Sequence, residues 1–427
     1  MRIRINNGRV LNPATLMDEV ADILIENNYI VNINSHIEDI PVDKVIDASN
    51  CYVMPGLIDL HVHLRDPGLT YKETLATGTS AAAKGGFTTI VAMANTNPVI
   101  DNREKLKGVL ESARISSPIQ VLQVGSVTEN LEGKVLTSAR ELKEAGAIAL
   151  SDDGKTVMDA RLFRQALQQA KEQNLVVLAH CEDEQMKGLG VIHEGETAKK
   201  LNLKGISNAV EDVIIARDIL LAKEVGARLH ICHCTTADGV KMIALAKKNN
   251  LSITAEVCPH HFTLTDEDIT PGDSNYKMAP PLRSSKDVQA MIQGLQDGTI
   301  DVIATDHAPH AAHEKTADLT NAAFGIVGLE TAVSLVITEL VKPGLLTPLQ
   351  MAEKMSYSPA QILRLNKGDL QIGKEADITI IDPHAEYIID KETFVSMGKN
   401  TPFHGRKVFG EVKATIFQGN VVYEAVV

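Results

Sequence analysis

Aromatic residues make up only 4% of this chain of 427 residues, and tryptophan is absent. Cysteine is also sparse, because the five thiols are scattered and an odd number cannot all pair into disulfides. No apolar run reaches the roughly 20 residues that a membrane-spanning helix requires, and no charged-then-apolar leader is evident. These absences argue against a membrane protein or a disulfide-stabilised secreted protein, so we expect a cytoplasmic one.

Positive charge is in the minority as well. The chain has 42 Lys and Arg against 55 Asp and Glu, a formal net charge of -13. Such a surface repels phosphate backbones and anionic headgroups, so we expect neither nucleic acid nor a membrane as a partner. A small anionic substrate would then need a local cation. Apolar residues at 44% and charged residues at 23% are typical of a globular protein with a sizeable core.

Short apolar runs that alternate with segments of helical periodicity follow Pro55 and Gly56. Eight such runs are the number that closes a TIM barrel, so the sequence predicts an α/β fold with a (β/α)8 barrel. The expected strands are Leu57–Val62, Thr88–Ala94, Ile119–Val124, Ala147–Leu150, Leu175–Ala179, Arg228–Cys232, Ser252–Val257 and Asp301–Thr305. Helices are expected at Met158–Gln173, Val210–Val225, Gly239–Lys248 and Lys286–Gln296.

Both ends of the chain read as β-structure instead. Short apolar pieces between Asn, Gly and Asp turn residues fill the first part of the chain, and a similar pattern resumes at Ala376–Ile381. We therefore expect one small, β-sandwich-like domain built from both ends. Its expected parts are residues 1–55 and 365–427, with the barrel over residues 56–364.

Candidate metal ligands follow the ends of five expected strands, on the face where barrel enzymes carry their active sites. His61 and His63 are two residues apart on the first strand, so both imidazoles point to one face. The other candidates follow the fourth, fifth, sixth and eighth strands: Asp152 or Asp153, His180, His233 and Asp306. Six nitrogen and oxygen ligands exceed what one tetrahedral zinc ion takes. They suit two ions that share a bridging carboxylate, so the sequence predicts a binuclear site.

Taken singly, each of these residues is more often a capping or hydrogen-bonding group than a ligand. Alternation along the strand places Cys232 and Cys234 opposite His233, so we interpret both as packed core thiols. The pair that follows the seventh strand, His260 and His261, fits a supporting role at least as well as ligation. The other histidines, His36, His193, His230, His384 and His404, carry no sign of a site.

Two motifs then point to a family. Residues 61–68, HVHLRDPG, resemble the HxHxRxPG segment of dihydroorotases, and residues 304–310, ATDHAPH, resemble their ATDHAPH segment. The similarity extends to residues 92–98, 324–328 and 400–403 and covers essentially the whole chain. The resemblance implies a barrel flanked by a small β-domain, two Zn²⁺ ions per chain and a place in pyrimidine biosynthesis.

The branch that the chain resembles has an aspartate where hydantoinases, allantoinases and other dihydroorotases have a carboxylated lysine between the ions. Residues 147–154 contain no lysine. The resemblance implies that one ion binds His61, His63 and Asp306, that the other binds His180 and His233, and that Asp153 bridges them. It also implies a set of substrate contacts: His63, Arg65, Asn95, His310, Phe324 and Gly325. One departure is Ala279, where the family usually has asparagine, and it predicts weaker substrate binding.

The reaction implied is the reversible cyclisation of N-carbamoyl-L-aspartate to L-dihydroorotate. In the hydrolytic direction, two cations would lower the pKa of a bridging water to about 7 and polarise the amide carbonyl. Asp306 can accept the proton of that water and return it to the leaving ring nitrogen. Arg65 is placed to hold the substrate carboxylate with two parallel hydrogen bonds.

Two other functions stay open at this point. A dihydropyrimidinase, hydantoinase or allantoinase would share the fold, but the missing lysine and the presence of Arg65 count against it. A catalytically silent barrel used as an assembly scaffold should have lost ligands, whereas this chain keeps six. The candidate partners are a second copy of the chain, in a homodimer, and aspartate transcarbamoylase.

Overall fold

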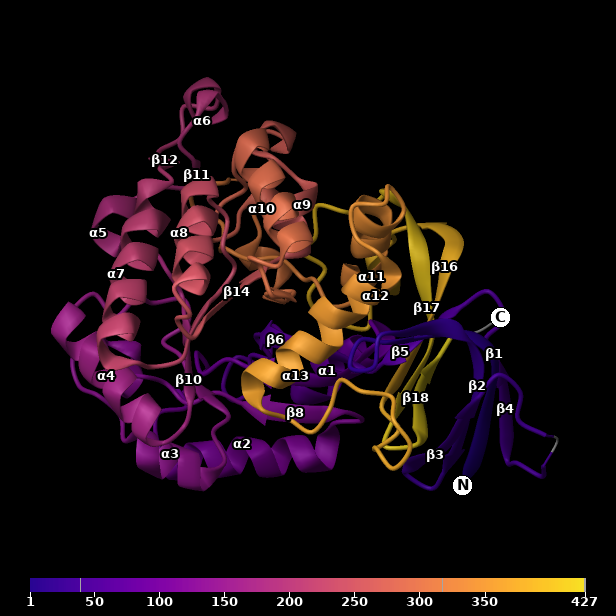
Figure 1. Ribbon diagram of the computed structural model, residues 1–427. Helices are drawn as coiled ribbons and strands as arrows, with labels where there is room; N and C mark the ends of the chain where they lie inside the picture. The colour runs from indigo at the N-terminus through magenta and orange to yellow at the C-terminus, as the bar shows by residue number, and fades with distance from the viewer. Residues whose placement is uncertain (39, 317, 426–427) are drawn as a thin grey trace.

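The structure is a computed structural model that describes residues 1–38, 40–316 and 318–425. It has a body in which helices surround parallel strands, and a twisted sheet at one side that contains strands from both ends of the chain (Figure 1). The two β-rich ends therefore meet in space, as their composition predicts.

Eight strands of the body run parallel in chain order, three in one sheet and five in another. They match the eight apolar runs: β6 (Leu57–Val62), β7 (Phe87–Ala92), β8 (Gln120–Gln123), β9 (Ala149–Leu150), β10 (Val176–Ala179), β13 (Leu229–Ile231), β14 (Ile253–Val257) and β15 (Val302–Ile303). Single parallel bridges join the two sheets at Gly125 with Leu150 and at Val62 with His307. This is the strand order of a (β/α)8 barrel.

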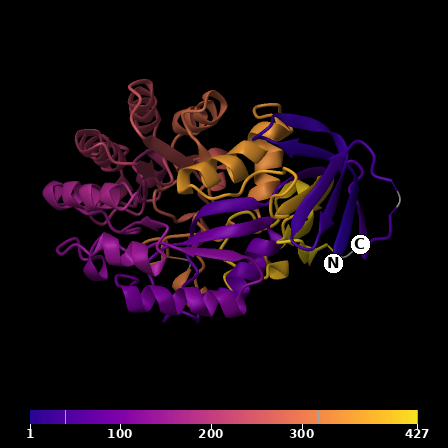
Figure 2. The same ribbon diagram turned by 60° about the horizontal axis from the view of Figure 1, so that its bottom comes forward.

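Helices cover the outside of these strands (Figures 1 and 2). They are α1 (Leu75–Lys84), α2 (Arg103–Ser116), α3 (Ala139–Ala145), α4 (Ala160–Glu172), α7 (Ala209–Val225), α8 (Ala237–Lys248), α10 (Ser285–Asp297), α11 (Ala332–Val336), α12 (Pro348–Ala352) and α13 (Ser358–Leu363). The four helices predicted from periodicity are thus confirmed as α4, α7, α8 and α10. In α4, the side chain of Asp159 caps the first turn, and the residues at three- and four-residue spacing are buried: Phe163, Ala166, Leu167 and Ala170.

An excursion that the sequence pattern does not predict separates β10 from α7. It consists of α5 (Glu184–Lys187), β11 (Ile192–His193), α6 (Glu196–Lys200) and β12 (Gly205–Ile206). The tip with α6 projects from the body in Figure 1. Elements of two to five residues are too short to show a hydrophobic period, which is why the pattern gives no sign of them.

The sheet at the side holds eight strands hydrogen-bonded into one layer that branches at β1. They are β1 (Arg2–Asn12), β2 (Met17–Glu26), β3 (Tyr29–Asn34), β4 (Lys44–Asp47), β5 (Tyr52–Pro55), β16 (Ile378–Ile388), β17 (Lys407–Phe417) and β18 (Asn420–Glu424). The two ends of the chain join where β5 pairs with β16, with Val53 opposite Ile380. Both of these side chains lie in one buried cluster with Ile3, Ile23 and Ile416.

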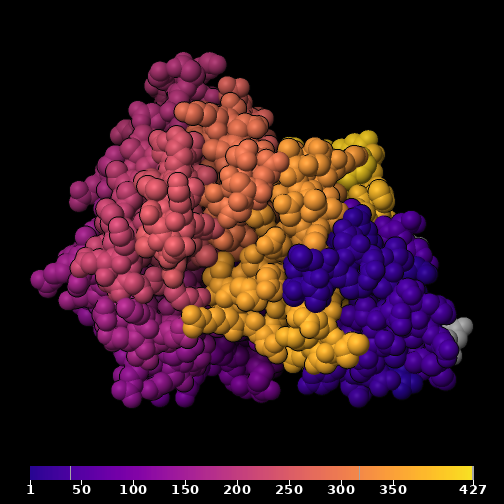
Figure 3. All heavy atoms as spheres, in the orientation of Figure 1, coloured from indigo at the N-terminus to yellow at the C-terminus, as the bar shows by residue number. Residues whose placement is uncertain are grey.

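The sheet packs against the body through β17, which contacts α11 and α1, and through β1 and β5, which contact α12. In Figure 3 the N-terminal part of the chain lies beside the segment that includes α12. β5 ends at Pro55, α13 ends at Leu363 and β16 begins at Ile378, and the domain boundaries near residues 55 and 365 stay predictions. Across residues 1–38, 40–316 and 318–425, no helix is both long and apolar enough to cross a membrane.

Candidate metal centre and active site

The first strand of the body is tied to the last at the level of the candidate site. The carboxylate of Asp59 accepts hydrogen bonds from the Thr305 backbone N at 3.1 Å and from its Oγ1 at 2.6 Å. It also accepts one from the His61 backbone N at 3.1 Å. Burial raises the pKa of Asp59 to about 7. Asp59 thus fixes β6, which carries the two histidines, against the segment that carries Asp306; the only signal for it in the sequence is an acidic residue within an apolar run.

All six predicted ligands are buried and meet at the carboxyl ends of the strands. His63 Nε2 lies 2.9 Å from Asp306 Oδ1, and His61 Nε2 lies 3.5 Å from the same oxygen. The Nδ1 of His180 lies 3.0 Å from the Nε2 of His233. The structure therefore brings together the residues that the sequence analysis grouped from five different strands.

Asp153 lies between the two groups of histidines. Its Oδ1 is 3.1 Å from His61 Nε2, 3.6 Å from His180 Nδ1 and 3.8 Å from His233 Nε2. Its Oδ2 is 3.4 Å from His63 Nε2. The neighbouring Asp152 points away and accepts hydrogen bonds from the backbone N atoms of Val127 and Thr128. Asp153 is therefore the carboxylate that lies within 4 Å of all four candidate histidines.

The chemistry of these residues fits divalent cations. Nε2 of His61 and Oδ1 of Asp153 are buried without a hydrogen-bond partner, which is costly unless another group binds them. Burial opposes protonation of His61, but the carboxylates of Asp153, Asp306 and Glu256 outweigh it and raise its pKa well above the ordinary value. The field at this point therefore favours positive charge.

A cavity of about 220 Å³ opens beside the candidate ligands. All the residues with predicted substrate contacts border it: His63, Arg65, Asn95, His310, Phe324 and Gly325. Arg65 is 9% exposed and donates from Nε to the Pro309 carbonyl, so it is not a surface ion-pair residue. Ala279 also borders the cavity, so the departure from the family pattern lies in the cavity wall.

The segment between β16 and β17 leaves the small sheet and reaches this cavity wall. Asn400 donates from Nδ2 to the carbonyls of Ala308 at 3.0 Å and Gly325 at 3.1 Å. Its Oδ1 accepts from the His310 backbone N at 3.1 Å. Asn400 therefore holds two loops that border the cavity, a role that the sequence analysis did not assign to it.

Glu182 and Lys187 also border the cavity. The sequence analysis did not single them out, because they lie in the segment between β10 and α7 that shows no periodic pattern. Lys187 donates from Nζ to Glu182 Oε2 at 2.5 Å and lies 4.6 Å from the ring centre of Phe324. The same carboxylate oxygen is 3.5 Å from His180 Nε2. No motif marks either residue, although an acidic side chain two residues after a predicted ligand is a weak sign.

The prediction for the two cysteines beside His233 is only partly right. Both thiols are buried, as expected. Cys234 packs with the outer helices, but Cys232 lies in the inner cluster and close to His61. Strict alternation ends because β13 stops at Ile231 and His233 has a left-handed φ of 32°.

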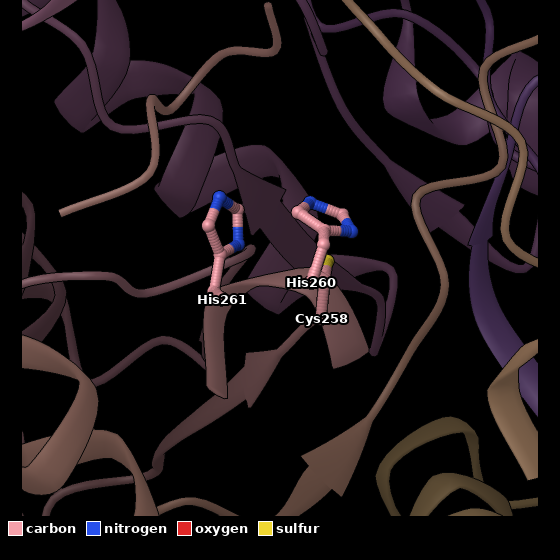
Figure 4. Close-up of side chains that lie close together, drawn as sticks. All are labelled: Cys258, His260 and His261. Carbon is pink, nitrogen blue, oxygen red and sulfur yellow. The ribbon is translucent and has the colours of Figure 1, made fainter. Parts of the chain in front are cut away.

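A second group of potential ligands is formed by Cys258, His260 and His261 (Figure 4). All three come from the single turn after β14, and none borders the cavity. His261 Nε2 lies 3.0 Å from the Pro280 carbonyl. Burial lowers the pKa of His260 to about 4, so its imidazole is neutral. These features agree with a supporting role in the loop, and ligation by the pair stays untested.

Comparison with solved structures defines the class of protein. The L-hydantoinase of Arthrobacter aurescens superposes with a TM-score of 0.89 at 27% identity over 99% of this chain and 96% of that chain. The dihydropyrimidinase of Brevibacillus agri NCHU1002 gives 0.87 at 25% identity over 99% and 95%. The fold and the site therefore place the chain among the cyclic amidohydrolases.

Sequence comparison narrows the class to one family. A family model described as Dihydro-orotase-like matches residues 51–239. A dihydroorotase from Pelotomaculum thermopropionicum is 48% identical over 99% of this chain and 99% of its own length. A dihydroorotase from Syntrophus aciditrophicus is 46% identical over 99% and 100%. The chain belongs to the dihydroorotase family.

Proposed function

We propose that this chain is a dihydroorotase that interconverts N-carbamoyl-L-aspartate and L-dihydroorotate in pyrimidine biosynthesis. The observation that carries the proposal is the identity of 45–48% to dihydroorotases over nearly the whole chain. A buried six-ligand cluster beside a cavity that Arg65 borders supports it. Closure of the eight strands into one barrel, with a sandwich-like second domain, belongs to the same proposal.

The cofactor proposed is a pair of divalent cations, zinc by the family resemblance. His61, His63 and Asp306 would hold one ion, and His180 and His233 the other, with Asp153 between them. When bound, such ions supply positive charge that polarises an amide carbonyl and lowers the pKa of water. The unpartnered Nε2 of His61 and Oδ1 of Asp153 are the structural support for this assignment, and Nδ1 is the nitrogen of His180 that faces Asp153 and His233.

Asp306 is the proposed proton carrier. Burial alone would raise its pKa, but positive charge at His61 and hydrogen bonding to His63 hold the pKa of Asp306 below the usual range. The carboxylate is therefore ionised at neutral pH and can accept, at an Oδ atom, the proton of the water that attacks the amide carbonyl. It would deliver that proton to the ring nitrogen when the amide bond breaks.

Arg65 and its neighbours are proposed to orient the substrate. The guanidinium fork of Arg65 suits a carboxylate, and its NH2 group lies 3.5 Å from His310 Nε2. His310 Nε2 also lies 2.8 Å from the Phe324 carbonyl, so the two predicted contacts form one wall. The Oδ1 of Asn95 lies 2.9 Å from His63 Nδ1, and its Nδ2 donates to the Asp153 carbonyl. Asn95, a proposed substrate contact, is thus bonded to two of the proposed metal ligands.

The alternative activities are less well supported. Identity to the solved hydantoinases is 27% or less, well below the identity to the dihydroorotases. No lysine lies in residues 147–154, and a scaffold without activity would not need six buried ligands. A cytoplasmic location, a homodimer and association with aspartate transcarbamoylase stay predictions.

The test is a comparison of four substrates with purified protein. Hydrolysis of dihydroorotate should exceed that of dihydrouracil, hydantoin and allantoin, and elemental analysis should find about two divalent ions per chain. Arg65→Met should lower kcat/KM for dihydroorotate roughly 10- to 150-fold, which corresponds to the free energy of one charge-assisted hydrogen bond, about 1.5–3 kcal/mol. Arg103→Met, at an exposed ion pair with Glu144, is the control. Faster hydrolysis of dihydrouracil, hydantoin or allantoin than of dihydroorotate, or full activity with one ion per chain, would contradict the proposal.

A further inference from the structure

The buried carboxylate of Glu256 on β14 touches both groups of candidate ligands without being one of them. Its Oε1 lies 2.7 Å from His61 Nδ1 and accepts a hydrogen bond from the backbone N of His233 at 3.3 Å. Glu256 is 1% exposed, and His61 is fully buried. Glu256 itself does not border the cavity.

The other carboxylate oxygen is held by a chain of hydrogen bonds that ends at a hydroxyl. Glu256 Oε2 lies 3.0 Å from His230 Nε2, and His230 Nδ1 lies 2.8 Å from Thr254 Oγ1. His230 and Thr254 are register partners on the adjoining strands β13 and β14. Both are therefore fixed by the backbone of the barrel rather than by a loop.

The donors and acceptors of this chain can be assigned because a carboxylate only accepts. His230 must then donate from Nε2 to Glu256, so its Nδ1 accepts from the Thr254 hydroxyl. By the same reasoning, His61 donates from Nδ1 to Glu256, and in the neutral imidazole that binds a metal ion this leaves the lone pair on Nε2. That Nε2 is the buried, unpartnered atom 3.1 Å from Asp153 Oδ1.

We infer that Glu256 is a positioning residue, which holds His61 in the tautomer and the orientation that metal binding requires, and that His230 and Thr254 hold Glu256 in turn. A metal-bound histidine commonly donates its other ring N–H to a carboxylate, and such partners affect metal affinity 10- to 100-fold. The same carboxylate also accepts a hydrogen bond from the backbone N of His233, a candidate ligand of the other ion, so Glu256 helps to hold the left-handed backbone of that residue. The inference rests on the proposed binuclear centre.

The experiment measures zinc affinity by competition with a chromophoric chelator, without substrate. Glu256→Gln should weaken binding at least about tenfold, because an amide can donate to Nδ1 and stabilise the wrong tautomer. At saturating zinc, KM for dihydroorotate should stay within about twofold while kcat falls, since Glu256 does not border the cavity. His230→Ala should weaken zinc binding in the same direction, and His230→Gln, which can still donate to Glu256, should restore most of it.

Glu330→Gln is the matched control, because Glu330 is also a buried carboxylate but binds backbone N atoms of residues 395 and 396, away from the site. The zinc affinity of the Glu330→Gln variant should equal that of the unchanged protein. An unaltered affinity in Glu256→Gln and His230→Ala would overturn the inference. So would a third ion that Glu256→Gln removes, since Glu256 would then be a ligand together with His61 and Cys232. If zinc affinity depends on Glu256 but dihydroorotate is not hydrolysed, the positioning role stands and the proposed substrate fails.

Discussion

Replacing Asn400 by alanine tests how far the cavity depends on the segment that returns from the small sheet. The change removes three buried hydrogen bonds, to the carbonyls of Ala308 and Gly325 and from the His310 backbone N. At about 0.5–1.5 kcal/mol each, the loss is about 1.5–4.5 kcal/mol. Unfolding entropy for a chain of 427 residues is about 0.9 kcal/mol/K. We therefore expect Tm to fall by roughly 2–5 °C in differential scanning calorimetry.

Activity should fall as well, because His310 and Gly325 border the cavity. A displacement of about 1 Å can cost up to roughly 100-fold in rate, so kcat/KM for dihydroorotate should drop more than stability alone explains. Asn366→Ala, at an exposed asparagine that accepts from Lys374, is the control and should shift Tm by less than about 1 °C. If Asn400→Ala keeps both the Tm and the kcat/KM of the unchanged protein, Asn400 does not hold the cavity wall.

Three further predictions follow from the site. Asp306→Asn should retain partial metal binding but lower kcat at least about 100-fold, because an amide cannot carry a proton at neutral pH; near-normal kcat would remove Asp306 from this role. Ala279→Asn should lower KM for dihydroorotate or carbamoyl-aspartate by roughly 2- to 13-fold, the value of one neutral hydrogen bond, and unchanged KM values would show a site rebuilt around alanine. Burial, followed by the charge of Lys277, lowers the pKa of Lys315 from 10.5 to about 7. Between these pH values the unfolded chain binds more protons, so stability should rise with pH, and Lys315→Met should flatten that slope in urea titrations. An equal slope in the variant would refute the assignment.

The sequence predicted the strands and the ligand positions because both depend on local order. An apolar run bounded by turns marks a barrel strand wherever it occurs, and His61 and His63 share a face through the period of two alone. His180, His233 and Asp306 needed only the rule that active sites lie at the carboxyl ends of barrel strands, whereas the choice of Asp153 over Asp152 came from the family resemblance.

The features that the sequence did not reveal depend on distant segments. Asn400 reaches the cavity by a path that no local pattern encodes, and the excursion with Lys187 is built from elements too short to be periodic. Cys232 was assigned to the wrong side because alternation fails where His233 takes a left-handed φ. His230 seemed to have no role, since its significance comes from a partner on the adjoining strand.

The sheet that joins both ends of the chain also sets a constraint during synthesis. β5 is made before the whole body and pairs with β16, which is made after it. Until β16 leaves the ribosome, β5 presents an open strand edge, and such edges recruit other chains. Folding of the sheet must therefore wait for translation to reach β16, so conditions that slow elongation late in the message should increase aggregation of the nascent protein.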